Sequence, residues 1–244
     1  MEVKQIPAEN ACVEPSRNEA NVVPWSIRDT WIGVVLLVLI SGGMVAALFL
    51  GMNRQYLQSI GVLFLELVYL LPIVLIFAWR RIHWKHLGFG KFTLNVMGVG
   101  CGLLIGGYAI ILLHNALLYI FKIDTQGDQI FKIFNQLESP AWLFIVGAVI
   151  APIVEEIFFR GFLFQGFRQK YGWLSALLLS SAIFGAAHLD PVSFIPTFIL
   201  GCVLGYVYHR SNSVWPGILF HAAINSFSLC AVYTLSQFPG LIPS

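Results

Sequence analysis

Charged residues are scarce in this 244-residue chain, since only 11% of its positions are Asp, Glu, Lys or Arg. A soluble domain usually carries about 25% charged residues, and 58% of this chain is hydrophobic. This excess of apolar residues is larger than one aqueous core needs, so the composition excludes an ordinary soluble protein. It indicates an integral membrane protein built from helices.

Cysteine and net charge are also low. The four cysteines have no paired spacing, so the sequence indicates neither a disulfide framework nor a zinc knuckle. The formal net charge of +2 is too small to suggest a nucleic-acid partner. Residues 1–30 are polar and hold no short apolar run behind a basic start, so they do not look like a secretory signal. We expect a polar cytosolic tail there.

Long apolar runs fill the rest of the chain, and each approaches or exceeds the ~20 residues that a helix needs to cross a bilayer. The seven predicted spans are 31–52, 57–79, 94–121, 141–169, 173–189, 192–208 and 215–235. We therefore predict an all-α, polytopic membrane bundle of about seven transmembrane helices (six to eight). Three N-terminal spans would occupy residues 31–140, and a catalytic four-helix core would occupy residues 141–244.

Lysine and arginine set the expected orientation. With the N-terminus placed in the cytosol, ten of the 14 Lys and Arg residues fall on the inner side and three on the outer side. The remaining one, Arg160, lies within a span. Positive residues gather on the cytosolic side of membrane proteins. We therefore expect a multi-pass protein of the cell membrane with a cytosolic N-terminus.

The fourth span carries three ionisable residues, Glu155, Glu156 and Arg160, in an otherwise apolar run. Each charge near the bilayer centre costs about 2.5–3.5 kcal/mol, which marks the cluster as a candidate functional site. Glu156 and Arg160 are four residues apart, and this spacing predicts an ion pair on one helix face. Glu155 points about 100° away from Glu156. This leaves Glu155 as an unpaired carboxylate suited to act as a base.

Polar residues on two later spans complete the set. Phe184 and His188 lie four residues apart near the end of the fifth span, and His221 and Asn225 have the same spacing on the seventh. Residues four apart share a helix face. We therefore expect Glu155, His188, His221 and Asn225 to meet inside the bundle. The second span also holds one carboxylate, Glu66, to which the sequence assigns no role.

Taken in order, the motifs Glu-Glu-xxx-Arg, Phe-xxx-His and His-xxx-Asn resemble those of the CAAX prenyl endopeptidase type II and bacteriocin-processing family. Members of this family, also called CPBP or Abi, are intramembrane proteases. The resemblance covers about residues 141–230, while residues 1–140 carry no motif of this kind. Each motif alone is weak, but the three together are specific.

The resemblance implies a role for each matching residue. Glu155 would be the general base that activates a water, and His188 would hold or polarise that water. His221 and Asn225 would stabilise the oxyanion of the tetrahedral intermediate. The residues with an implied supporting role are Glu156, Arg160 and Phe184. These roles suit peptide hydrolysis, which needs a base for water and donors for the developing oxyanion.

Several alternatives stay open at this point. We favour no metal and no other cofactor, but two histidines and a glutamate can form a catalytic zinc set, whose ligands would be Glu155, His188 and His221. The expected partners are the lipid bilayer and a peptide or protein substrate. The protein could instead be a membrane scaffold or an immunity-type protein that cleaves nothing. A proton-coupled transporter is a further alternative, because intramembrane Glu and His also relay protons.

The seventh predicted span places His221 at a different membrane depth from Glu155 and His188. At 1.5 Å per residue, Glu155 and His188 lie roughly 21 and 24 Å from the inner ends of their spans. His221 lies only about 9 Å from the start of the seventh span. Non-helical backbone is tolerated at membrane depth where it lines a cavity. We therefore predict that residues 211–216 dip into the membrane, so that the seventh helix starts deep.

Overall fold

A computed structural model describes residues 22–51, 66–125, 127–128, 130–131 and 141–238, and within these ranges all regular structure is helical. The α-helices are α1 (Ile27–Gly51), α4 (Leu70–Arg80), α5 (Asn95–Ile120), α7 (Ala141–Phe144), α8 (Ala151–Glu156), α9 (Gln165–Tyr171), α10 (Trp173–Ala187), α11 (Phe194–Ser211) and α12 (Val214–Gln237). The other helical segments are the 3-10 helix η2 (Trp84–Leu87) and the π-helices η3 (Ile145–Ile150) and η4 (Ile157–Phe164).

The predicted all-α membrane bundle is confirmed. Four stretches of the described residues are long and apolar enough to cross a membrane, namely Ile27–Ala46, Asn95–Ile120, Ala141–Tyr171 and Val214–Gln237. α4 and α10 are apolar but shorter, and α11 has 18 residues. Six of the predicted spans coincide with helices to within a few residues. The second predicted span, 57–79, lies partly outside the described residues.

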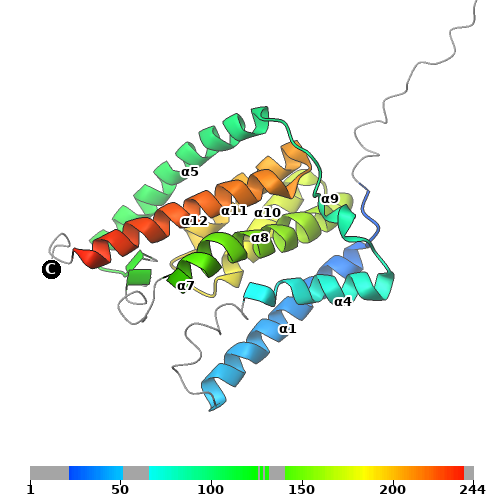
Figure 1. The fold of residues 1–244 in the computed structure, drawn as a ribbon, viewed down its shortest axis with the longest axis horizontal. Helices are drawn as coiled ribbons and strands as arrows, with labels where there is room; N and C mark the ends of the chain where they lie inside the picture. Colours follow the sequence, from blue (N-terminus) through cyan, green and yellow to red (C-terminus); the bar gives the residue numbers. More distant parts are fainter. Residues whose placement is uncertain (1–21, 52–65, 126, 129, 132–140, 239–244) are drawn as a thin grey trace, which may run out of the picture.

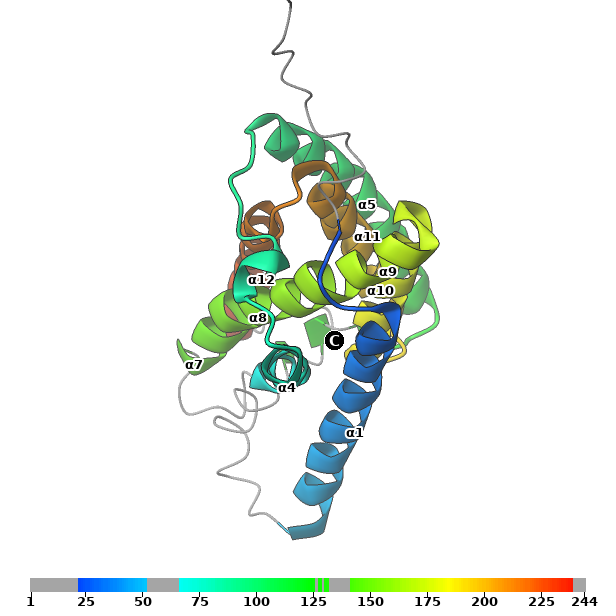
Figure 2. The same cartoon turned by 90° about the vertical axis from the view of Figure 1, so that its right-hand side faces the viewer.

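The continuous helix Ala141–Tyr171 forms the centre of the bundle (Figure 1). α5, α11 and α12 lie on one side of it, and α1 and α4 lie on the other, as the perpendicular view also shows (Figure 2). Its second half is aromatic, and the rings of Phe158, Phe159 and Phe162 are completely buried. Burying each of these rings contributes about 1.5–3 kcal/mol. The charged cluster therefore sits on a helix that is fixed by its neighbours on both sides.

Small residues on α11 let it approach α10 closely. A Cβ placed on Gly201 would lie 2.9 Å from the Cβ of Ser181, and one placed on Gly205 would lie 2.6 Å from Leu177. Close backbone approach at small residues is typical of helix pairs in membranes. A sharp turn at Gly172, whose φ of 80° favours glycine, reverses the chain between α9 and α10. This arrangement brings the backbone of α11 next to the central helix.

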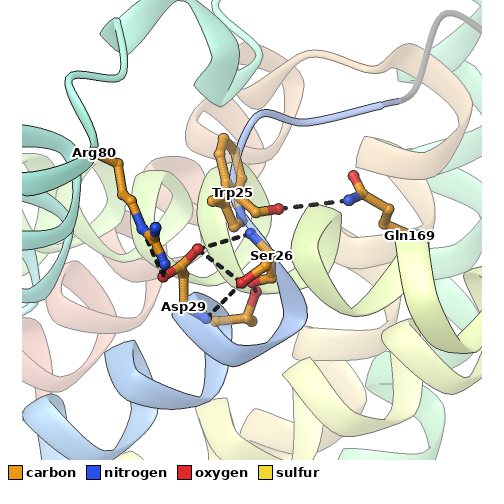
Figure 3. Close-up of polar contacts among 6 residues, drawn as sticks. Trp25, Ser26, Asp29, Arg80 and Gln169 are labelled. Atoms are coloured by element: carbon orange, nitrogen blue, oxygen red, sulfur yellow. Dashed lines mark hydrogen bonds and ion pairs between the residues drawn. The ribbon is translucent and has the colours of Figure 1, made fainter.

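The described structure begins at residue 22, inside the segment 1–30 that was predicted to be a polar tail (Figure 3). α1 begins at Ile27 rather than at residue 31, and Trp25 is 1% exposed. Asp29 accepts hydrogen bonds from the backbone N–H and the hydroxyl of Ser26, and it forms an ion pair with Arg80 at 2.8 Å. Gln169 donates to the Trp25 carbonyl. Residues 22–30 therefore anchor α1 to α4 and α9, and residues 1–21 lie outside the described residues.

Candidate functional site

A cavity of about 530 Å³ lies between α5, α11, α12 and the central helix. Glu155, His188, His221 and Asn225 all line it, and most of its other lining residues are apolar. A concave, largely apolar site with a few convergent polar groups is the usual form of a ligand-binding site. The structure therefore brings the four predicted catalytic residues to one cavity.

The predicted ion pair of Glu156 and Arg160 is present. The Arg160 Nη1 atom lies 2.7 Å from Glu156 Oε1, and neither side chain is more than 1% exposed. Arg160 Nη2 donates to the Gly201 carbonyl at 3.2 Å, and the guanidinium lies 4.6 Å from the ring centroid of Phe184. The arginine is thus satisfied by one carboxylate, one carbonyl and one aromatic face.

His221 lies between the two glutamates. Its Nδ1 is 3.3 Å from Glu156 Oε1, and its Nε2 is 3.6 Å from Glu155 Oε2. A carboxylate oxygen only accepts, so Nδ1 donates to Glu156. In a neutral ring, Nε2 is then an acceptor that faces a second carboxyl oxygen. One proton must therefore lie between His221 and Glu155 for these two groups to attract each other.

His188 uses one ring nitrogen in a hydrogen bond and keeps the other available to the cavity. Its Nδ1 lies 2.9 Å from the Phe184 carbonyl oxygen, which only accepts, so Nδ1 is the donor. The Nε2 atom of the neutral ring is then left as an acceptor. The Phe184 ring packs edge-on against His188 and His221, with centroid distances of 4.9 and 5.7 Å. Phe184 thus fixes the orientation of both histidines.

Asn225 is held by the π-helical segment η3. Its Nδ2 donates to the Gly147 carbonyl at 2.8 Å. Such π-helical turns are rare and often occur at functional sites. The amide group has a second N–H, so one donor remains beyond the bond to Gly147. The link to Gly147 joins α12 to the central helix, and the sequence motifs did not predict it.

Gly217 is a second feature that the motifs did not reveal. A Cβ at this position would lie 2.6 Å from Glu156 Oε2. Gly217 is four residues before His221, so both face the central helix from the same side of α12. In the sequence, the only sign of this close approach is a glycine one helical turn before the histidine. Without a side chain there, α12 can approach Glu156 closely enough for His221 to reach both carboxyl groups.

Glu66 also lines the cavity, although the sequence assigned it no role. Its Oε2 atom is buried and has no hydrogen-bond partner among the described residues. Glu155 lines the same cavity. The signal for this residue was a lone carboxylate inside an apolar run.

The three proposed zinc ligands do not converge in this arrangement. Among the described residues, no three His, Cys, Asp or Glu side chains lie close enough together to hold a metal ion. The Nδ1 atom of His188 faces a backbone carbonyl, and the two nitrogens of His221 face the two glutamates. Metal dependence stays an alternative prediction.

The start of α12 is held by contacts to the segment of residues 88–90. Ser213 caps the helix, and its hydroxyl donates to the Gly90 carbonyl at 2.7 Å. The Val214 N–H donates to the Gly88 carbonyl, and the Val214 side chain is fully buried. Residues 88–90 thus cover Ser213 and Val214 at the helix start, while Trp215 is 43% exposed. The depth of residues 211–216 in a membrane stays a prediction.

Known proteins resemble part of this chain. The "Putative membrane peptidase YdiL" of Bacillus subtilis is 29% identical over 109 residues, which are 45% of each chain. The UPF0177 protein YxdF of Lactococcus lactis is 28% identical over 183 residues, 71% of this chain and 98% of that protein. The UPF0177 protein YbdI of the same organism is 33% identical over 88 residues, 35% of this chain and 47% of that protein.

The chain thus spans less than half the length of YdiL and of YbdI. No solved structure matches the chain. The model of the Rce1-like type II CAAX prenyl endopeptidase family matches residues 137–227. This segment contains the three motifs and the four cavity-lining residues named above, and the predicted resemblance is therefore confirmed. Residues 137–227 are thus similar to the Rce1-like type II CAAX prenyl endopeptidases.

Proposed function

We propose that this protein is an intramembrane endopeptidase that hydrolyses a peptide bond of a membrane-associated protein or peptide. One observation carries the proposal. The Glu155 carboxyl group, only 5% exposed and carried by a membrane helix, faces a cavity that His188, His221 and Asn225 also line. A charge in this position is costly, and a base beside hydrogen-bond donors is what peptide hydrolysis requires.

In the proposed reaction, a water molecule sits between Glu155 and His188. The Nε2 atom of His188 accepts one O–H of this water, and the Glu155 carboxylate takes the other proton as the oxygen attacks the peptide carbonyl. A tetrahedral intermediate with a negatively charged oxygen results. Glu155 then delivers its proton to the leaving nitrogen, the C–N bond breaks, and a carboxylic acid and an amine are released.

The developing oxyanion needs donors that are already in place. In the proposal, the Nε2–H of a doubly protonated His221, whose Nδ1–H is bound to Glu156, and the free N–H of the Asn225 amide supply them. Glu156 accepts from His221 Nδ1 at 3.3 Å and so orients the ring, in the way that the aspartate orients the histidine of a Ser-His-Asp triad. Arg160 balances the charge of Glu156, which leaves Glu155 free to act as the base.

The decisive variant is Glu155→Gln, which keeps the shape of the side chain and removes the base. General-base catalysis contributes roughly a hundredfold to ten-thousandfold, so we expect cleavage to fall by that factor while the protein stays inserted and folded. Asp128→Asn, which alters an exposed carboxylate, is the matched control and should retain activity. Peptides that accumulate with wild type but not with Glu155→Gln, measured by mass spectrometry, would identify substrates.

Each alternative gives a different result in this experiment. Unchanged cleavage by Glu155→Gln would contradict the role of Glu155. A cellular phenotype that survives Glu155→Gln without any cleavage product would favour the scaffold or immunity-type function. Loss of cleavage with a chelator and its recovery with zinc would favour the metal-dependent version. The proposed cytosolic N-terminus can be tested separately, by labelling single cysteines placed at either end of the chain from one side of the membrane.

A further inference from the structure

The proposed reaction leaves one carboxyl group of the cavity unused. Glu66 precedes α4 and therefore lies outside the segment that matches the protease family. Its Oε2 atom is buried without a hydrogen-bond partner among the described residues, yet the residue lines the same cavity as Glu155. Buried polar groups in folded proteins nearly always have a partner. The partner of Glu66 is thus expected to come from something that enters the cavity.

The position of Glu66 is fixed by its neighbours. The backbone N–H of Tyr69 donates to the Glu66 carbonyl at 3.2 Å. The Tyr69 ring packs against the rings of Phe158 and Phe159, with centroid distances of 5.9 and 5.5 Å. Val68 is only 3% exposed. These contacts hold the turn that carries Glu66 against the helix that carries Glu155.

The cavity offers Glu66 no strongly basic side chain as a partner. Among its described lining residues there is no Lys or Arg. The buried Arg160 is already bound to Glu156 and to the Gly201 carbonyl. His221 lies against Glu155 and Glu156. A cation that enters the cavity would therefore give the Glu66 carboxyl group a partner and stabilise its ionised form.

We propose that Glu66 binds a positively charged group of the substrate, a Lys or Arg side chain or a free amine, next to the scissile bond. This inference rests on the proposed peptidase function and adds a substrate preference to it. The rest of the cavity wall is mostly apolar and accepts apolar residues with little discrimination. A single carboxylate in such a wall selects strongly for substrates that carry a cation. With an uncharged substrate, the carboxylate would stay buried without a partner.

The test is a cycle of two enzymes and two peptides. Purified full-length protein in detergent micelles is first given a peptide library derived from a proteome, and mass spectrometry locates the cleavage sites. A peptide with Lys or Arg beside such a site, and its Gln counterpart, are then cleaved by wild type and by Glu66→Gln. We expect wild type to prefer the cationic peptide by a kcat/KM ratio on the order of a hundredfold. Glu66→Gln should cleave both peptides alike, and Glu66→Asp should keep the preference.

Two results would overturn the inference. One is a wild-type enzyme without preference for the cationic peptide, which decides the matter even if Glu66→Gln does not fold. The other is a Glu66→Gln enzyme that loses the same factor with both peptides, since that pattern indicates a structural role. Glu155→Gln separates this inference from the function on which it rests. If Glu155→Gln cleaves like wild type, the peptidase mechanism fails; if it is inactive and no preference exists, only the role of Glu66 fails.

Discussion

Two carboxylate–arginine pairs of this molecule have buried carboxylates but differ in the exposure of their arginines. Glu156 and Arg160 belong to one helix, lie 2.7 Å apart, and are at most 1% exposed. Asp29 and Arg80 join α1 to α4 at 2.8 Å, and the Arg80 side chain is 44% exposed (Figure 3). The lengths of the two contacts are nearly equal. What separates the pairs is access to solvent, and this difference predicts different energetic and functional consequences.

A fully buried pair is a poor source of stability, because the cost of removing both charges from water offsets most of their attraction. Its presence is better explained by what it holds in place. Glu156 contacts His221, which in turn lies 3.6 Å from Glu155, so the buried pair orients the proposed catalytic residues. The Asp29–Arg80 pair contacts none of them and fastens two helices at the edge of the bundle. The first pair is therefore expected to matter for activity and the second for assembly alone.

The largest effect is expected from Arg160→Met. This change leaves the Glu156 carboxylate buried without its cation, which typically destabilises a protein by about 3–5 kcal/mol. The free energy of unfolding, measured by denaturation in mixed micelles, should fall by that amount, and cleavage should be lost. The double variant Arg160→Met, Glu156→Met should regain most of the stability, because no unpaired charge remains. It should still lack activity, since His221 has lost its partner.

A double variant that regained both stability and cleavage would contradict the orienting role of Glu156. One as unstable as Arg160→Met would show that the site needs the ion pair for folding as well. Either result would remove the contrast between the two pairs, because the buried pair would then act as an ordinary structural contact.

Local spacing predicted the parts of the site that lie within one helix. The four-residue separation of Glu156 and Arg160 predicted their contact, and the same separation placed His221 and Asn225 on one face of α12, from which both line the cavity. Hydropathy likewise located the helices, because a run of ~20 apolar residues has few alternatives to a membrane span. These features depend on neighbours in the sequence, so the sequence contains them directly.

Contacts between distant segments were not predictable in the same way. The Asn225 amide donates a hydrogen bond to the Gly147 carbonyl, 78 positions away in the sequence. Glu66 lines the cavity although it belongs to the other half of the chain. The π-helical segments η3 and η4 also have no periodicity that a sequence pattern reveals. The folding of residues 22–30 was missed because their contacts are to Arg80 and Gln169. In each case the partner is chosen by packing rather than by spacing.

An intermediate effect is expected from Gly217→Ala, which tests how tightly the buried pair is confined. The new Cβ would lie 2.6 Å from Glu156 Oε2, and that carboxylate is already held by Arg160 and His221. Overpacking of this kind typically costs about 1–3 kcal/mol, and a displaced Glu156 should lower cleavage as well. The matched control is Gly102→Ala in α5, where a Cβ would meet nothing within 4 Å. It should be neutral or stabilise by up to about 1 kcal/mol.

The smallest effect is expected from Arg80→Gln, which removes the partly exposed arginine but leaves Asp29, whose side chain is only 3% exposed. Ion pairs with solvent access contribute roughly 0.2–1 kcal/mol, and Asp29 keeps its two hydrogen bonds from Ser26. The loss of stability should therefore stay below about 1 kcal/mol and should shrink as salt is raised, because screening already weakens the wild-type pair. Cleavage should be unchanged. Arg81→Gln, at the exposed neighbouring position, controls for the removal of a positive charge. A loss as large as that of Arg160→Met, or one that salt does not reduce, would show that solvent access is not what distinguishes the two pairs.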